Sequence, residues 1–231
     1  MKYLLDTANQ DSIKAAINSY CLQGITTNPT LVSRENLDYK MMLLDIKKIL
    51  NGKDFHIQVT ETKYDAIIEE AKLIKELIGD TVKIKIPVST EGYKAIKYLS
   101  KNNYKITATA VCNVNQAIMA ALCGADDLAV YINRITKSGR DGIEVIKQIK
   151  KIFVENKITS KILGASFENI DQIKQAILNG CDAVTVNPDM LNKLLYSKVT
   201  DDSIIKFTTD FEKVYGPNNT GLKILKTNRG D

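Results

Sequence analysis

The sequence has few of the residues from which metal sites and histidine-dependent active sites are built. Its 231 residues include a single histidine, His56, and four cysteines without a C-x-x-C pair. A cysteine–histidine metal site and a catalytic triad are therefore nearly excluded. We expect His56 to be a hydrogen-bonded residue of the core and the cysteines to be reduced, as in a cytoplasmic protein. The cysteines are Cys21, Cys112, Cys123 and Cys181.

Membrane-spanning and nucleotide-binding patterns are also missing. Residues 106–125 carry no charge, but they include threonines and asparagines and change from a strand to a helix pattern, so we expect no membrane span there. Asp6 lies too near the start for a signal peptide. No G-x-G-x-x-G or G-x-x-x-x-G-K-[ST] motif occurs, and the net charge of +5 is spread without a basic block. We expect a cytoplasmic protein that acts on small molecules and binds neither nucleic acid nor a membrane.

Short β-branched runs alternate with longer stretches of helical period along the chain. In one such stretch Ile67, Ala71, Ile74 and Ile78 share a face, and Gly79 follows as a stop signal. Eight such units favour an α/β fold, a single (β/α)8 TIM barrel, with a doubly wound open sheet as the alternative. The predicted strands are residues 3–6, 24–28, 55–59, 82–88, 105–111, 128–133, 161–166 and 183–186.

The C-terminal part of the chain lies beyond the last predicted strand. We expect an additional C-terminal helix near 201–215, so that residues 1–215 form the barrel domain together with this helix. Residues 216–231 are rich in glycine, asparagine and lysine. We expect them to form a tail that packs between subunits or is disordered.

Nearly every predicted strand ends in a hydrogen-bonding side chain. In a barrel of this kind the catalytic groups lie at the carboxyl ends of the strands, so these side chains form the candidate site. A single polar residue at a strand end is usually only a cap, but a ring of them is harder to explain by structure alone. The residues are Asp6, Thr26, Asn28, Gln58, Lys85, Thr109, Tyr131, Asn133, Arg134, Ser166 and Asn187.

Lys83 and Lys85 lie on one face of the strand predicted at 82–88. Burial in a barrel mouth disfavours an ammonium group, so it would lower the pKa of Lys85 and free its amine to attack a carbonyl. Asp6 would oppose this shift and exchange protons with a carbinolamine; the alternative is that Lys85 is only a buried ion-pair partner of Asp6. Lys83 either lowers the pKa of Lys85 further or extends to the other end of the barrel.

Motifs along nearly the whole chain resemble the transaldolase family, and most closely its fructose-6-phosphate aldolase branch. The resemblance implies a Schiff-base aldolase that needs no metal and no cofactor. It also suggests a homo-oligomer, a decamer or another pentamer-based ring, with exchanged C-terminal helices. The motifs are "LLDTAN" at 4–9, "GITTNPTL" at 24–31, "VKIKIPVSTEGYKAIKYL" at 82–99, "TATAV" at 107–111, "YINRI" at 131–135, "ILGASF" at 162–167 and "GCDAVTV" at 180–186.

The same resemblance implies a role for each matched residue. Lys85 matches the lysine that forms the Schiff base, Asp6 matches the proton-transferring aspartate, and Thr109 matches the threonine that positions a catalytic water. The remaining matches bind substrate: Thr26 and Asn28 the hydroxyl groups of the donor, and Arg134 and Ser166 the phosphate of the acceptor.

Two positions separate the branches of the family. Transaldolases have a glutamate at the end of strand three and a phenylalanine in strand six, whereas this chain has Gln58 and Tyr131, as the aldolases do. A tyrosine hydroxyl can serve as the acid and base of the enamine step, with Gln58 and Thr109 ordering a water. Glu168 departs from the pattern, because the family usually offers a basic side chain to the phosphate there.

The favoured prediction is an aldolase that reversibly cleaves fructose 6-phosphate, or a similar ketose with or without phosphate, to dihydroxyacetone and an aldose or aldose phosphate. The first alternative is a transaldolase of the pentose phosphate pathway, which passes the same three-carbon unit from fructose 6-phosphate or sedoheptulose 7-phosphate to an aldose phosphate. The second is a non-catalytic barrel that binds sugar phosphates. Glu168 leaves open whether the acceptor carries a phosphate.

Overall fold

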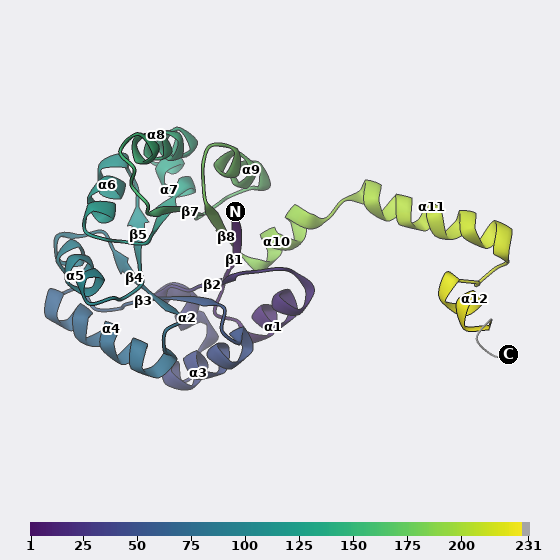
Figure 1. Ribbon diagram of the computed structural model, residues 1–231, viewed down its shortest axis with the longest axis horizontal. Coiled ribbons are helices and arrows are strands. Elements are labelled where there is room, and N and C mark those ends of the chain that lie inside the picture. The colour runs from purple at the N-terminus through teal and green to yellow at the C-terminus, as the bar shows by residue number, and fades with distance from the viewer. Residues whose placement is uncertain (228–231) are drawn as a thin grey trace. The chain divides into compact units, whose positions relative to one another are not determined.

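The computed structural model describes residues 1–227, and the eight strands within them form a closed parallel barrel (Figure 1). Each strand pairs with the next along the chain, and β8 pairs with β1. This closed order confirms the predicted (β/α)8 barrel and contradicts the open sheet. The strands are β1 (Lys2–Asp6), β2 (Gly24–Thr26), β3 (Asp54–Gln58), β4 (Val82–Pro87), β5 (Ile106–Val111), β6 (Asp127–Tyr131), β7 (Lys161–Ala165) and β8 (Ala183–Val186).

Helices connect the strands and surround the barrel (Figure 1). The predicted apolar face of residues 64–78 is buried, as expected for a helix that packs on a sheet. Two connections hold a pair of helices each, one after β2 and one after β6. The helices are α1 (Gln10–Ser19), α2 (Pro29–Glu35), α3 (Tyr39–Leu50), α4 (Tyr64–Ile78), α5 (Thr90–Lys101), α6 (Val114–Leu122), α7 (Ile132–Lys137), α8 (Gly142–Glu155), α9 (Ile170–Leu178) and α10 (Pro188–Leu195).

The sixth strand is shorter than predicted. It ends at Tyr131, and α7 begins at the next residue, so the expectation of a strand up to residue 133 is wrong. Asn133 N donates a hydrogen bond to the carbonyl oxygen of Ser166 at 2.9 Å, which ties the first turn of α7 to the end of β7. Asn133 and Arg134 therefore lie on a helix, and Arg134 lines the cavity at the carboxyl ends of the strands from there.

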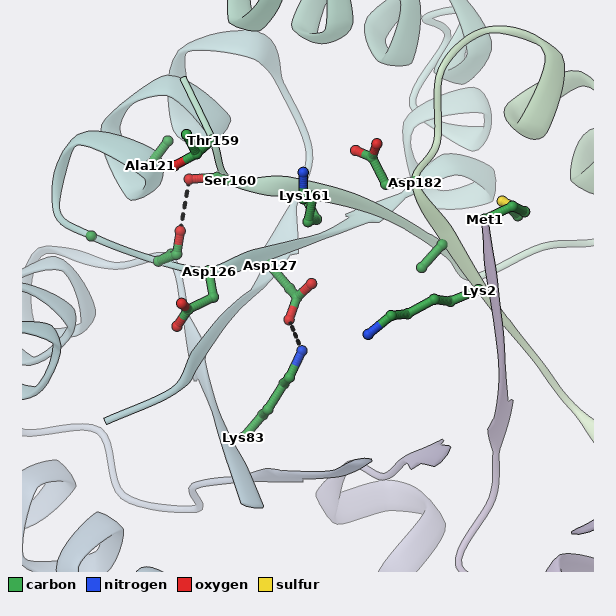
Figure 2. Close-up of a pocket in the computed structure, with 13 residues that line it drawn as sticks. Met1, Lys2, Lys83, Ala121, Asp126, Asp127, Thr159, Ser160, Lys161 and Asp182 are labelled. Carbon is green, nitrogen blue, oxygen red and sulfur yellow. Dashed lines mark hydrogen bonds and ion pairs between the residues drawn. The ribbon is translucent and has the colours of Figure 1, made fainter. Parts of the chain in front are cut away.

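Polar side chains occupy the amino end of the barrel, where the strands begin. Lys83 Nζ lies 2.6 Å from Asp127 Oδ2 and 3.6 Å from Asp54 Oδ2. Burial alone would lower the pKa of Lys83, but the carboxylates of Asp127 and Asp54 outweigh it and hold this pKa above its ordinary value. Figure 2 shows Lys83 and Asp127 pointing toward one another. Both residues line a cavity of about 540 Å³. Of the two roles predicted for Lys83, extension to the other end of the barrel is therefore the one confirmed.

Residues beyond 191 form a unit of their own. It contains the end of α10 and two further helices, α11 (Lys198–Tyr215) and α12 (Gly221–Thr227). The helix predicted near 201–215 is α11, which begins earlier because the Ser197 side chain caps it. Of the predicted tail, residues 228–231 lie outside the described residues. The division into a 1–215 domain and a 216–231 tail stays a prediction.

No helix within residues 1–227 has the length and apolar character that crossing a membrane requires.

The ion pair at the amino end should contribute measurably to stability. Asp127→Asn leaves the largely buried Lys83 without its nearest carboxylate, which should lower the free energy of unfolding by roughly 3 kcal/mol in a urea titration. Asp45→Asn, which breaks the exposed pair with Lys48, is the control and should cost less than about 1 kcal/mol. Equal losses in the two variants would contradict a structural role for the buried pair.

Candidate functional site

A cavity of about 120 Å³ lies at the carboxyl ends of the strands, with Lys85 in its wall. This is close to the volume of about 150 Å³ in which an engineered protein cavity holds benzene, so a small molecule of a few heavy atoms fits. Of the eleven predicted strand-end residues, seven line the cavity: Asp6, Thr26, Asn28, Lys85, Tyr131, Arg134 and Ser166. The four that do not are Gln58, Thr109, Asn133 and Asn187. The predicted convergence of polar strand ends is therefore found in the structure.

Lys85 is almost fully buried, with 4% of its surface exposed. Its Nζ donates a hydrogen bond to the Thr27 carbonyl oxygen at 2.6 Å. Burial lowers the pKa of Lys85 below its ordinary value, and the Asp6 carboxylate opposes this shift. Lys83 has no part in it, because its ammonium is neutralised at the opposite end of the barrel. Within residues 1–227 no ion pair joins Lys85 to Asp6, so the prediction that Lys85 is only an ion-pair partner is wrong.

Asp6, at the end of β1, is held by the neighbouring strand. Thr26 Oγ1 donates a hydrogen bond to Asp6 Oδ1 at 2.6 Å, and the same Thr26 oxygen lies 2.7 Å from Thr185 Oγ1. Both threonines are buried and line the cavity with Asp6. The carboxylate therefore lies in the cavity with Lys85 without being paired to it.

Tyr131 lies at the end of β6 beside Thr109, whose hydroxyl oxygen is 3.1 Å from the Tyr131 hydroxyl. A register shift in β5 next to Thr109 gives Ala110 a φ of 57°, which is strained for a residue other than glycine and is a device often found beside active sites. Burial raises the pKa of Tyr131, while Thr109 and Arg134 oppose part of the rise. At neutral pH the Tyr131 hydroxyl therefore carries its proton and can donate it.

Gln58 and His56 lie inside the barrel on β3. Gln58 is aligned with Lys85 on β4 but does not line the cavity, and its Oε1 is buried without a hydrogen-bond partner among residues 1–227. That oxygen is a free acceptor close to the site. His56 is 2% exposed, and its Nδ1 lies 2.9 Å from Thr107 Oγ1. Burial lowers the pKa of His56 well below its usual range, so it is a neutral core residue, as predicted.

The outer end of the site is basic. The guanidinium of Arg134 lies over the Tyr131 ring, 4.7 Å from its centre, and Ser166 has a left-handed φ of 58°. Glu168 does not line the cavity; its carboxylate lies 3.5 Å from Lys137 Nζ. The charge of Glu168 is thus offset by a neighbouring cation rather than presented to the cavity.

One predicted strand-end residue caps a helix instead of lining the cavity, and four residues that do line it were missed by sequence reasoning. Asn187, predicted at the end of β8, instead caps α10, because its Oδ1 accepts a hydrogen bond from Met190 N at 2.8 Å. Thr185, two residues earlier, reaches the cavity; its signal was a lone hydroxyl in the apolar strand "AVTV". The other missed lining residues are Ala129, Leu163 and Ala165, whose side chains give no chemical signal.

Among residues 1–227, His, Cys, Asp and Glu side chains do not gather in any group of three that could hold a metal ion.

Solved structures with this fold include a sulfite-bound variant of flavocytochrome b2. It superposes with a TM-score of 0.60 at 11% sequence identity, covering 81% of this chain and 56% of that one. At that identity the likeness concerns the barrel fold alone.

Other proteins are similar in sequence to this chain over nearly their whole length. A "Probable transaldolase" of Thermoplasma volcanium is 38% identical over 93% of this chain and 96% of its own length. A "Probable transaldolase" of Brachyspira hyodysenteriae is 35% identical over 94% of this chain and 100% of its own length. A "Probable fructose-6-phosphate aldolase" of Streptococcus pneumoniae is 34% identical over 91% and 96%. A family model described as Transaldolase/Fructose-6-phosphate aldolase matches residues 3–220. The chain therefore belongs to the transaldolase/fructose-6-phosphate aldolase family.

Proposed function

We propose that this protein is a class I aldolase that cleaves fructose 6-phosphate, or a similar ketose, into dihydroxyacetone and an aldose or aldose phosphate. The observation that carries the proposal is the buried amine of Lys85. It lies in a cavity of small-molecule size, lacks an ion-pair partner within residues 1–227, and has a lowered pKa. An amine in this state is a nucleophile for a carbonyl carbon.

The first chemical stage is formation of an imine. Lys85 Nζ adds to the C2 carbonyl of the ketose, and the carbonyl oxygen becomes the hydroxyl of a carbinolamine. Protonation of that hydroxyl lets it leave as water, and the nitrogen keeps one proton as an iminium. Asp6, which shares the cavity with Lys85, is the proposed proton carrier for this stage.

The second stage breaks the bond between C3 and C4. The C4 hydroxyl loses its proton, the aldose leaves, and the electron pair of the broken bond moves toward the iminium to form an enamine. Tyr131 is the proposed acid and base, and its hydroxyl lies 3.1 Å from that of Thr109. Thr109 and the free Gln58 acceptor are suited to ordering a water beside it. Protonation of the enamine and hydrolysis of the imine then release dihydroxyacetone.

A transaldolase is the second candidate, and the names of the relatives favour it. Of the three relatives described above, two are named as probable transaldolases and one as a probable fructose-6-phosphate aldolase. The two activities share every step up to the enamine, so they differ only in its fate. The protonated hydroxyl of Tyr131 supports the aldolase, because it offers the enamine a proton before an acceptor aldose arrives.

The sugar phosphate is proposed to bind with its phosphate toward Arg134 and Ser166, which lie at the outer end of the cavity. An arginine guanidinium suits phosphate because it offers several N–H donors in one plane. Lys137 offsets the charge of Glu168, which removes part of the repulsion that a carboxylate there would cause. Neither a metal nor a cofactor is required in this scheme.

The working protein is proposed to be a cytoplasmic homo-oligomer with exchanged C-terminal helices. In support, α11 buries none of its residues. Four apolar side chains follow each other along it at spacings of three and four residues, which makes one stripe. They are Ile204, Phe207, Phe211 and Val214, between 36% and 76% exposed. A second copy of the chain is the proposed partner of this stripe, in a decamer or another pentamer-based ring.

Trapping of the imine tests the proposed chemistry. Borohydride reduction in the presence of dihydroxyacetone should leave a stable adduct on Lys85, located by tandem mass spectrometry. Lys85→Met and Lys85→Arg should both abolish it, because neither side chain offers a nucleophilic amine. The matched control is Lys83→Arg, which keeps the charge opposite Asp127 and should keep the adduct. Absence of an adduct on the wild-type protein would refute every Schiff-base function, and would leave the sugar-phosphate-binding barrel.

The fate of the enamine separates the two candidate activities. With fructose 6-phosphate and no acceptor, we expect steady release of free dihydroxyacetone, measured by a coupled reduction. Tyr131→Phe should slow this release by roughly 100-fold, since it removes the proposed acid, while the adduct on Lys85 still forms. Tyr98→Phe, on the outside of the barrel, is the control and should change nothing. Consumption of fructose 6-phosphate only when an acceptor aldose is added, with a new ketose formed and no free dihydroxyacetone, would favour the transaldolase.

The α11 stripe should be needed for assembly. We expect light scattering to give the wild-type protein a mass several times that of one chain. Replacing Phe207 and Phe211 together by glutamate should shift it to smaller species, because charges cannot be buried in an apolar contact. Lys206→Glu lies between the stripe residues and tests charge alone; it should leave the mass unchanged. An unchanged mass for the double variant would contradict the proposed contact.

A further inference from the structure

Thr185 is a buried hydroxyl to which neither the fold nor the proposed chemistry has assigned a role. It lies on β8, is 4% exposed, and has valines on both sides in the strand. A valine would fill the same space without a polar atom, and a buried hydroxyl is costly unless it is hydrogen-bonded. The partner of Thr185 is Thr26 Oγ1, 2.7 Å away on β2.

The direction of these hydrogen bonds follows from the number of hydrogens. A threonine hydroxyl has one hydrogen to donate, and an ionised carboxylate can only accept. Thr26 Oγ1 lies 2.6 Å from Asp6 Oδ1, so its hydrogen points to the carboxylate. No hydrogen is left for Thr185, and the Thr185 hydroxyl must therefore donate to Thr26. The two hydrogen bonds therefore point the same way: Thr185 on β8 donates to Thr26 on β2, and Thr26 donates to Asp6 at the end of β1.

We propose that Thr185 is a positioning residue that, through Thr26, fixes the Asp6 carboxylate toward the amine of Lys85. A donor that is itself hydrogen-bonded is polarised, so Thr185 strengthens the bond from Thr26 to Asp6. It also gives Thr26 Oγ1 a second hydrogen-bond partner besides Asp6, so that the rotamer of Thr26 is held from two sides. All four residues line the same cavity, which makes the arrangement part of the site. The proposal rests on the proposed function, in which Asp6 carries protons to and from the carbinolamine.

Removal of the single hydroxyl tests the proposal. Thr185→Val keeps the shape and β-propensity of the side chain, so the barrel should fold. A general acid or base contributes about 10²–10⁴-fold, and the group that only orients it should account for roughly tenfold. We expect kcat for ketose cleavage and the rate of borohydride trapping with dihydroxyacetone to fall by that factor, with KM unchanged. Thr185→Ser restores the hydroxyl and should restore both rates.

A matched control tests whether the loss of activity is specific to Thr185 or follows from removing any buried hydroxyl inside the barrel. Thr107 is also fully buried inside the barrel, but its hydroxyl contacts His56 and not Asp6. Thr107→Val should therefore leave both rates near the wild-type values, with circular dichroism confirming that each variant is folded. A loss equal to that of Thr185→Val would overturn the proposal, and so would a failure of Thr185→Ser to restore activity.

A double-mutant cycle tests whether Thr185 acts through Asp6. In an Asp6→Ala background there is no carboxylate left to position, so Thr185→Val should have no further effect on the trapping rate. An undiminished tenfold effect in that background, or a rise in KM in place of the fall in kcat, would overturn the proposal in favour of direct contact with the substrate. If the wild-type protein forms no adduct on Lys85, the proposed function itself fails, whatever the Thr185 variants do.

Discussion

In a closed barrel of parallel strands, every second side chain points into a narrow interior that holds little water. A charged group placed there must be neutralised, paired or allowed to lose its charge. Lys83 and Lys85, two residues apart on β4, meet this constraint in different ways. Lys83 is paired with Asp127 at the amino end, whereas Lys85, nearer the carboxyl end, donates to the Thr27 carbonyl and has a lowered pKa. The same strand thus provides a lysine held in an ion pair and a lysine whose pKa is lowered.

The residues around Lys85 also differ in how each is hydrogen-bonded and whether it carries a charge. A carboxylate in direct contact would hold the lysine as an ammonium, but Asp6 is instead bonded to Thr26 and stays within reach of the cavity. Tyr131 keeps its proton because it is buried, and Thr109 fixes its hydroxyl. The candidate site therefore contains an amine with a lowered pKa, a carboxyl group and a hydroxyl group that keeps its proton. The proposed imine formation and carbon–carbon cleavage use these three groups.

Members of the family share the barrel and the lysine chemistry, so the distinction between lyase and transferase depends on what happens to one intermediate. A protein that protonates the enamine quickly releases dihydroxyacetone, and one that protects it transfers the unit to a second sugar. In this chain the groups proposed to decide are Tyr131, which carries a proton, and Gln58, whose buried oxygen has no hydrogen-bond partner among residues 1–227. The proposed phosphate-binding region is a different one, where Arg134 and the Glu168–Lys137 pair lie.

The order of the elements and most of the residues that line the cavity could be predicted from the sequence. The strand and helix periods are local, and the carboxyl ends of parallel strands converge, so the sequence alone places Asp6, Lys85 and Tyr131 together. Contacts between side chains far apart in the chain became visible only in the folded barrel. Thr26 and Thr185 are separated by 159 positions, and Lys83 and Asp127 by 44. No local pattern encodes such pairs, because they depend on which inward side chains lie at the same level of the closed barrel. The partner of Lys83 and the partner of Thr185 follow from that closure.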